Sequence, residues 1–221
     1  EWKNVVDPKI WTEHLANEFK KLGGKIAIAS VHAIDLKEDS VSLKCDSADY
    51  EASQIVLAAG AWSKALAQSI GDSLPLDTER GYNTTLPAGA FDLKTHITFS
   101  NHGFVVTKAG GGIRVGGAVE LGGLSLAPNF KRSEILLNKA AQFLPDLNIE
   151  NGKQWMGFRP SMPDSLPVIS YASQSKRVIY AFGHGHLGLT QSAGTAELVA
   201  ELIHHQPSSI PLEAYSALRF K

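Results

Sequence analysis

Residues 177–203 read RVIYAFGHGHLGLTQSAGTAELVAELI. The apolar run 178–182 predicts a short buried strand, and glycines follow at positions 183, 185 and 188. Apolar residues then recur at helical spacing, which predicts an amphipathic helix ending near Ile203. Glycines between a strand and a helix let the backbone approach a bound group, and the free N–H groups of a helix start favour negative charge. The same pattern also suits a tight turn that only packs a helix on a sheet, so the rest of the chain must decide.

Two further motifs lie upstream. Residues 155–169, WMGFRPSMPDSLPVI, contain a G-x-R-P segment, and residues 55–62, IVLAAGAW, form an apolar run that ends in A-G-x-W. Together with GHGHLGLT, in this order, they resemble the FAD-dependent D-amino-acid oxidase and dehydrogenase family, which includes glycine and sarcosine oxidases. The resemblance covers nearly the whole chain. It departs at Ala193 and Ala196, where the family commonly has Pro and Gly.

The resemblance implies an α+β flavoprotein fold with two parts. Residues 1–78 and 155–221 correspond to part of an α/β FAD-binding domain, and residues 79–154 to a substrate domain built on an antiparallel sheet with a helix. The family's opening strand and its G-x-G-x-x-G turn for the FAD pyrophosphate have no counterpart at the start of this sequence. We therefore expect a fold that is incomplete at its N-terminus. The cluster Gly110-Gly111-Gly112 lies between two alternating segments and predicts a hairpin turn instead.

Composition excludes several classes of protein. The 221 residues carry 21 Lys and Arg against 22 Asp and Glu, a net charge of −1, and no basic stripe indicates nucleic-acid binding. The single cysteine, Cys45, excludes an internal disulfide and suits a reducing compartment. No apolar run approaches a membrane span. We expect a cytoplasmic protein, with peripheral contact to the inner membrane left open.

The first part of the chain predicts alternating helices and strands. Asp7 and Pro8 have the N-cap and first-turn positions of a helix. Its apolar stripe is expected to be buried and comprises Trp11, Leu15, Phe19 and Leu22. We then expect a strand over 25–31, a hairpin with arms 41–44 and 50–52, a strand buried on both faces over 55–59, and a helix over 63–70.

From residue 74 the pattern becomes one of short alternating segments. Strands are expected over 84–86, 96–100, 104–108 and 113–120, followed by an amphipathic helix over 131–143 whose apolar side carries Ile135, Leu136, Ala140 and Phe143. By resemblance, Arg80-Gly81-Tyr82 marks the crossing into the substrate sheet.

Arg159 of the G-x-R-P segment is the first candidate for chemistry. A guanidinium binds a planar carboxylate with two hydrogen bonds and stays charged at any working pH. By resemblance, Arg159 binds the substrate carboxylate beside the flavin. The alternative is a structural arginine that bridges a loop.

His184 and His186 leave three readings open: a metal pair, a general base, or a loop that lines the flavin. The resemblance implies the third: backbone groups of the loop and a histidine set the electronics of the flavin, and His184 is the catalytic candidate. Tyr82 is either a wall or hydrogen-bond donor of the substrate pocket, or a half-buried tyrosine of the sheet. Glu120 and Asp164 are expected to stabilise loops and strand ends.

The resemblance also implies cofactor contacts in three places. Val31 corresponds to a contact on the adenine side of the cofactor. The end of the strand over 55–59 corresponds to a contact with the ribose or diphosphate, made by Ala59, Gly60 and Trp62. The alternative for this strand end is plain close packing of a helix on the strand. The loop and helix start correspond to the isoalloxazine ring; its residues are Gly183, Gly185, His186, Leu187, Gly188, Leu189 and Thr190.

Two functions follow. The first is part of an FAD-dependent oxidoreductase that transfers hydride to the flavin from the CH–NH bond of a D-amino acid or small secondary amino acid, giving the imino and then the keto acid. The acceptor that takes the electrons from the flavin, oxygen or a membrane quinone pathway, is left open. The second is a non-catalytic fragment that folds alone, or pairs with itself or with a missing FAD-binding half, without binding FAD. In either case we expect weak or no FAD retention by this chain alone.

Overall fold

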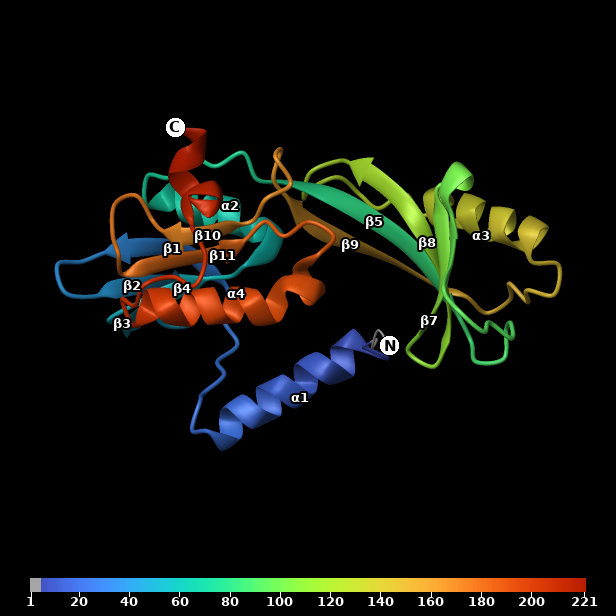
Figure 1. The fold of residues 1–221 in the computed structure, drawn as a ribbon, viewed down its shortest axis with the longest axis horizontal. Coiled ribbons are helices and arrows are strands. Elements are labelled where there is room, and N and C mark those ends of the chain that lie inside the picture. Colours follow the sequence, from blue (N-terminus) through green and yellow to red (C-terminus); the bar gives the residue numbers. More distant parts are fainter. Residues whose placement is uncertain (1–4) are drawn as a thin grey trace. The chain divides into compact units, whose positions relative to one another are not determined.

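The computed structural model describes residues 5–221, and the chain divides into two compact units (Figure 1). Unit 1 comprises the residues up to Ile26 together with Arg80–Phe158, and unit 2 comprises Ala27–Glu79 and Arg159–Lys221. The assignment of a substrate role and a cofactor role to such parts remains a proposal.

Unit 2 is built on a sheet in the order β10-β11-β4, formed by Val168–Tyr171, Val178–Phe182 and Ile55–Leu57. The central strand β11 pairs antiparallel with β10 and parallel with β4. Its side chains alternate between two cores: Tyr180 and its neighbours two residues away face one, and Ile179 faces the other. Helix α4 (Gly188–Ile203) covers the Ile179 face through Leu198 and Leu202 (Figure 1).

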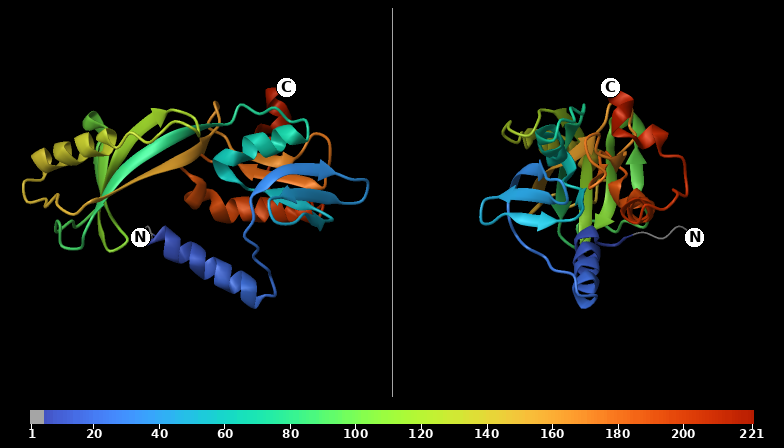
Figure 2. Two further views of the ribbon diagram at one scale, coloured as in Figure 1. Left: turned by 180° about the vertical axis from the view of Figure 1, so that it is seen from behind. Right: turned by 90° about the vertical axis from the view of Figure 1, so that its left-hand side faces the viewer.

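The opposite face of this sheet is covered by α2 (Ser63–Ser69) and by an antiparallel meander, β1 (Val31–Leu36), β2 (Val41–Cys45) and β3 (Tyr50–Ala52) (Figure 2). The 3-10 helix η1 (Gly60–Trp62) joins β4 to α2. After α4 the chain forms two 3-10 helices, η3 (Glu213–Tyr215) and η4 (Ala217–Phe220).

Unit 2 also holds a buried carboxylate that ties distant segments together. Asp72 accepts the Tyr180 hydroxyl at 2.8 Å and the Ser173 N–H at 2.9 Å, and it pairs with Lys221 at 3.3 Å. Because a buried carboxylate needs such partners, this group fixes the C-terminal residue against the sheet.

Unit 1 holds most of a five-stranded sheet and, among the described residues, the helices α1 (Pro8–Lys21) and α3 (Lys131–Phe143). The sheet has the order β6-β7-β8-β5-β9, formed by Ile97–Phe99, Phe104–Ala109, Gly112–Leu121, Asp77–Leu86 and Lys153–Ser161. Strands β6, β7 and β8 pair antiparallel, and the residues of β5 before Arg80 and of β9 after Phe158 belong to unit 2. The 3-10 helix η2 (Ser100–His102) joins β6 to β7. Helix α3 (Lys131–Phe143) packs on β7 and β8, and the shared core includes Phe104, Val115 and Ala140.

The mixed helix-and-sheet class is confirmed, and so are several predicted elements. Gly110 and Gly111, with φ of +57° and +78°, form the two-residue turn between β7 and β8, where an L side chain would be strained. The predicted helices over 63–70 and 131–143 and the predicted hairpin arms are present as α2, α3, β2 and β3.

Helix α1 (Pro8–Lys21) forms as predicted, with Asp7 accepting the N–H groups of Lys9 and Ile10, but the expected burial of its stripe is wrong. Trp11 is 42% exposed and Leu22 is 89% exposed, with Leu15 and Phe19 between them. An amphipathic pattern predicts a face that needs a cover, and no described residue buries this one.

Two further expectations need correction. Residues 25–30 form no strand, because Ser30 is held by the backbone and side chain of Asp46 outside any ladder, and β1 begins only at Val31. Strand β4 is open on one side, since Val56 is 40% exposed at the sheet edge. On α3, Ile135 and Phe143 are exposed while Ala140 is buried.

Among residues 5–221, no helix is both long enough and apolar enough to cross a membrane.

Candidate functional site

The end of β9 and the glycine loop after β11 lie side by side. The Gly185 N–H donates to the Pro160 carbonyl at 2.8 Å, and Ser161 forms an antiparallel bridge with His184. These contacts bring Arg159 next to the loop 183–188, although the two segments are well separated in the sequence. The two motifs that the sequence singled out therefore form one local site in unit 2.

The loop requires glycine for two reasons. Gly183 and Gly185 have φ of +85° and +53°, which L side chains rarely adopt. A Cβ on Gly183 would also lie 2.7 Å from the Cγ atom of Met162. No side chain caps the N-terminus of α4, where Leu187 occupies the N-cap position. The first turn of α4 therefore offers backbone N–H groups to a polar or anionic group.

The three loop glycines also have the spacing G-x-G-x-x-G between a strand and a helix, which the sequence analysis weighed only as separate glycines. That spacing marks dinucleotide-binding turns when a βαβ unit surrounds it. In the described chain, α4 is followed by η3 and η4 and by no second parallel strand. The spacing alone therefore indicates a close backbone approach and a free helix start.

Arg159 lies half-buried at this site, and its Nη1 atom has no hydrogen-bond partner among the described residues. Burial lowers the pKa of the Arg159 guanidinium, and the nearby Glu79 carboxylate opposes that shift. An arginine nonetheless keeps its charge at any physiological pH. Arg159 thus offers a charged donor that the chain itself does not fully use.

The two histidines make different contacts. His184 is half-buried with its Nε2 atom 2.9 Å from the Thr195 hydroxyl on α4, and burial lowers the pKa of His184, which favours the neutral ring. His186 is more exposed, and its Nε2 atom lies 2.6 Å from the Glu79 carboxylate.

In the described part of the chain, no three His, Cys, Asp or Glu residues could together hold a metal ion, so the metal reading gains no support.

Two more buried polar atoms near this loop have no hydrogen-bond partner within residues 5–221: the Ser161 hydroxyl and the Oε1 atom of Gln191 in the first turn of α4. Buried polar groups without partners are rare in folded proteins and call for an explanation. A ligand with polar edges would satisfy them.

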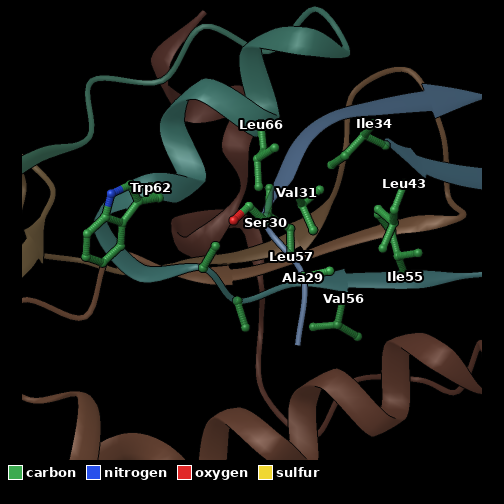
Figure 3. Close-up of a pocket in the computed structure, with 12 residues that line it drawn as sticks. Ala29, Ser30, Val31, Ile34, Leu43, Ile55, Val56, Leu57, Trp62 and Leu66 are labelled. Atoms are coloured by element: carbon green, nitrogen blue, oxygen red, sulfur yellow. The ribbon is translucent and has the colours of Figure 1, made fainter. Parts of the chain in front are cut away.

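A second candidate location in unit 2 is an apolar cavity of about 560 Å³ (Figure 3). Of the predicted cofactor residues, Val31, Ala59 and Trp62 line it, and Trp62 lies at one end with an exposed ring. Gly60 is beside them, with φ of +55° at the start of η1. The predicted adenine and ribose contacts therefore share one cavity, whereas the predicted flavin contacts share the glycine loop.

Tyr82 belongs to unit 1 and is only 1% exposed. Its hydroxyl donates to Glu120 at 2.5 Å and accepts the Asn129 N–H at 3.1 Å. Glu120 also pairs with the buried Arg80 and with Arg132, and the Tyr82 hydroxyl is the main cause that holds the pKa of Glu120 below its ordinary value. A substrate role for Tyr82 remains a prediction.

Asp164 makes a structural contact. It accepts two guanidinium N–H groups of Arg219, the nearer at 2.7 Å, and so holds η4 against the loop after β9.

Sequence reasoning missed the polar residues that complete the site: Glu79, Ser161, Gln191 and Thr195. Glu79 directly precedes Arg80-Gly81-Tyr82, and Ser161 directly follows G-x-R-P, so adjacency to the motifs was the available signal. Gln191 and Thr195 could have been placed by helical spacing on the face of α4 that begins at the loop.

Comparison with known proteins defines the class. A model of the family described as FAD dependent oxidoreductase matches residues 3–202, and the chain belongs to this family. It is 39% identical over 219 residues to a D-amino-acid oxidase of Bradyrhizobium diazoefficiens, with 97% of this chain and 52% of that relative covered. It is 34% identical over 174 residues to a D-amino acid dehydrogenase of Paramagnetospirillum magneticum, with 76% and 40% covered.

Solved structures agree with this class. Glycine oxidase from Geobacillus kaustophilus matches with a TM-score of 0.83 and 25% identity, over 93% of this chain and 56% of that one. Iminodiacetate oxidase from Chelativorans sp. BNC1 shares the fold with a TM-score of 0.81 at 19% identity, over 94% and 57%. The chain thus spans about half the length of the relatives it matches.

Proposed function

We propose that these 221 residues form part of an FAD-dependent oxidoreductase that oxidises the CH–NH bond of a D-amino acid or a small secondary amino acid. The observation that carries this proposal is the half-buried Arg159, whose Nη1 atom is unpaired beside a glycine loop with an uncapped helix start. The names of the relatives, D-amino-acid oxidase and dehydrogenase, support the substrate class.

The site suits FAD in two places. The loop 183–188, the free N–H groups of α4 and the unpaired Gln191 carbonyl would contact the polar edge of the flavin. The apolar cavity at Val31, Ala59 and Trp62 would take the other end of the cofactor. When bound, FAD supplies the acceptor of the hydride that leaves the substrate Cα.

The residues of the chain contribute binding and orientation. Arg159 holds the substrate carboxylate and so fixes the direction of the Cα–H bond. His184, kept neutral by burial and hydrogen-bonded to Thr195, places an uncharged polar group at the loop. The peptide contact between Gly185 and Pro160 keeps this loop in register with Arg159.

Turnover tests the proposal. With FAD supplied in saturating excess, the protein should convert D-alanine, glycine or sarcosine to the corresponding keto acid, with release of ammonia or methylamine, in the presence of oxygen or a quinone analogue. No product from any of the three with either acceptor would contradict it.

A second candidate is a fragment that pairs with another chain and does not bind FAD by itself. The exposed stripe of α1 and the open edge of β4 favour it. We predict that the 221-residue chain, purified alone, retains little FAD, because the contacts proposed for the cofactor are confined to the loop 183–188 and the cavity. Its absorbance near 450 nm measures this directly. A yellow sample with one flavin per chain would contradict the prediction and remove this candidate.

A further inference from the structure

We propose that Glu79 binds the amino group of the substrate, so that Arg159 and Glu79 together recognise a zwitterionic amino acid. The inference rests on the proposed function, because it places the substrate carboxylate on Arg159. It extends that function by naming a residue that distinguishes amino acids from other carboxylic acids.

Glu79 is placed at the site by the sheet and by a hydrogen bond. It lies on β5, and β5 is the neighbour of β9, the strand that carries Arg159. Its Oε2 atom lies 2.6 Å from the Nε2 atom of His186. The preceding loop residue, Gly185, donates its N–H to Pro160, the residue next to Arg159. Three segments distant in sequence therefore bring Glu79, His186 and Arg159 together within unit 2.

Glu79 and Arg159 are close but not paired. The Glu79 carboxylate is the charge that acts on the Arg159 guanidinium, yet no ion pair within 4 Å joins the two among the described residues. The guanidinium keeps an unpaired Nη1 atom, and the Glu79 side chain remains 32% exposed. The chain thus presents a positive and a negative group side by side, with donor capacity left on Arg159 and acceptor capacity left on Glu79.

This arrangement is complementary to the head group of an amino acid. A zwitterion carries a carboxylate and an ammonium on the same carbon, and each finds the opposite charge here. A carboxylic acid without the amino group finds Arg159 but leaves Glu79 unsatisfied. His186 holds the Glu79 side chain in place from the loop and leaves its second oxygen, Oε1, for the amino group.

The experiment compares two ligands that differ only in the amino group. In the protein reconstituted with FAD in saturating excess, kcat/KM is measured for D-alanine, and the Kd of propanoate is measured by isothermal titration. Glu79→Gln should lower kcat/KM for D-alanine about tenfold or more, because a charge-assisted hydrogen bond is lost. The Kd of propanoate should stay the same or fall, because a negative charge near its carboxylate is removed.

Glu51→Gln is the matched control. Glu51 is likewise a carboxylate hydrogen-bonded to a nitrogen of a side chain, Lys37 at 2.7 Å, but it lies on the exposed strand β3 of the same unit. Its substitution should change neither value. If Glu79→Gln weakened D-alanine and propanoate equally, or neither, the Glu79–His186 pair would only latch the loop and the inference would be wrong.

Arg159→Ala separates this inference from the proposed function. If it weakens both ligands while Glu79→Gln has no selective effect, the carboxylate site stands and only the Glu79 assignment fails. If Arg159→Ala weakens neither ligand, the proposed function itself fails.

Discussion

His184 shows how burial of one side chain sets its chemistry. The ring is half-buried against α4, shares a hydrogen bond with the Thr195 hydroxyl, and has a lowered pKa because of burial. A general base at this position would be neutral and ready to accept a proton at neutral pH, whereas a protonated ring would be disfavoured.

The lowered pKa makes stability depend on pH in a defined direction. Because the folded state disfavours the protonated ring, the contribution of His184 is complete above its unfolded pKa of about 6.5 and is lost as the pH falls towards the lower folded value. We expect the free energy of unfolding to decrease from pH 8 to pH 5, and the decrease to be smaller in His184→Gln. Urea unfolding at several pH values measures it.

The exposed His32 on β1 provides the control, since His32→Gln should keep the slope of the parent protein. Stability curves of the parent and of His184→Gln that run parallel over this pH range would show that burial does not control the ring.

Some residues of the site could be predicted from the sequence and others could not. Arg159 and the glycines of the loop were found because their chemistry is visible in a short motif. Glu79, Ser161 and Gln191 were not, because their importance comes from contacts between segments far apart in the chain.

At the scale of elements, local sequence signals were sufficient to predict the helices, caps and turns that depend on residues close together in the chain. The cap at Asp7, the two-residue glycine turn after β7 and the helix α3 depend on residues within one turn or one hairpin. Strand β9 was missed because its ladder partner, β5, lies far away in sequence. The stripe of α1 and the outer face of β4 were misjudged because an apolar pattern predicts that a cover is needed, not where it comes from.

The open edge of β4 leads to a prediction about association. Val56 is 40% exposed on an otherwise apolar edge strand, beside the apolar cavity (Figure 3). Such edges favour pairing with another chain. We expect the purified 221-residue chain to self-associate, and Val56→Lys to shift it towards monomer.

Val119→Lys is a matched control, because Val119 is also a strand valine, 42% exposed, but lies on β8 within unit 1. Sedimentation velocity over a wide range of concentrations measures both variants. A parent chain that stays monomeric throughout, or an equal effect of the two lysines, would count against the β4 edge as the contact.

At the scale of the whole molecule, the chain has the family fold over about half the length of its relatives. The change at residue 74 to short alternating segments indicated that a second part of the chain begins there, and the range 79–154 came from the resemblance, since no linker or charge run marks a boundary. The resemblance found in the motifs supplied the class of protein. The residues that distinguish one substrate from another depend on the arrangement of side chains, so they could only be inferred from the structure.

The central claim is that Arg159 binds the substrate carboxylate. It is tested by kcat/KM for D-alanine and for ethylamine, which lacks only the carboxylate, in the parent, Arg159→Lys and Arg159→Ala, each reconstituted with FAD in saturating excess. We predict that Arg159→Ala costs about 2 to 5 kcal/mol in transition-state binding for D-alanine. Arg159→Lys should lose part of this, because it keeps the charge but not the planar pair of donors. Ethylamine should be little affected, and flavin content should stay at the parent level in every variant. An unchanged ratio of D-alanine to ethylamine, together with loss of flavin or of folding, would contradict the account.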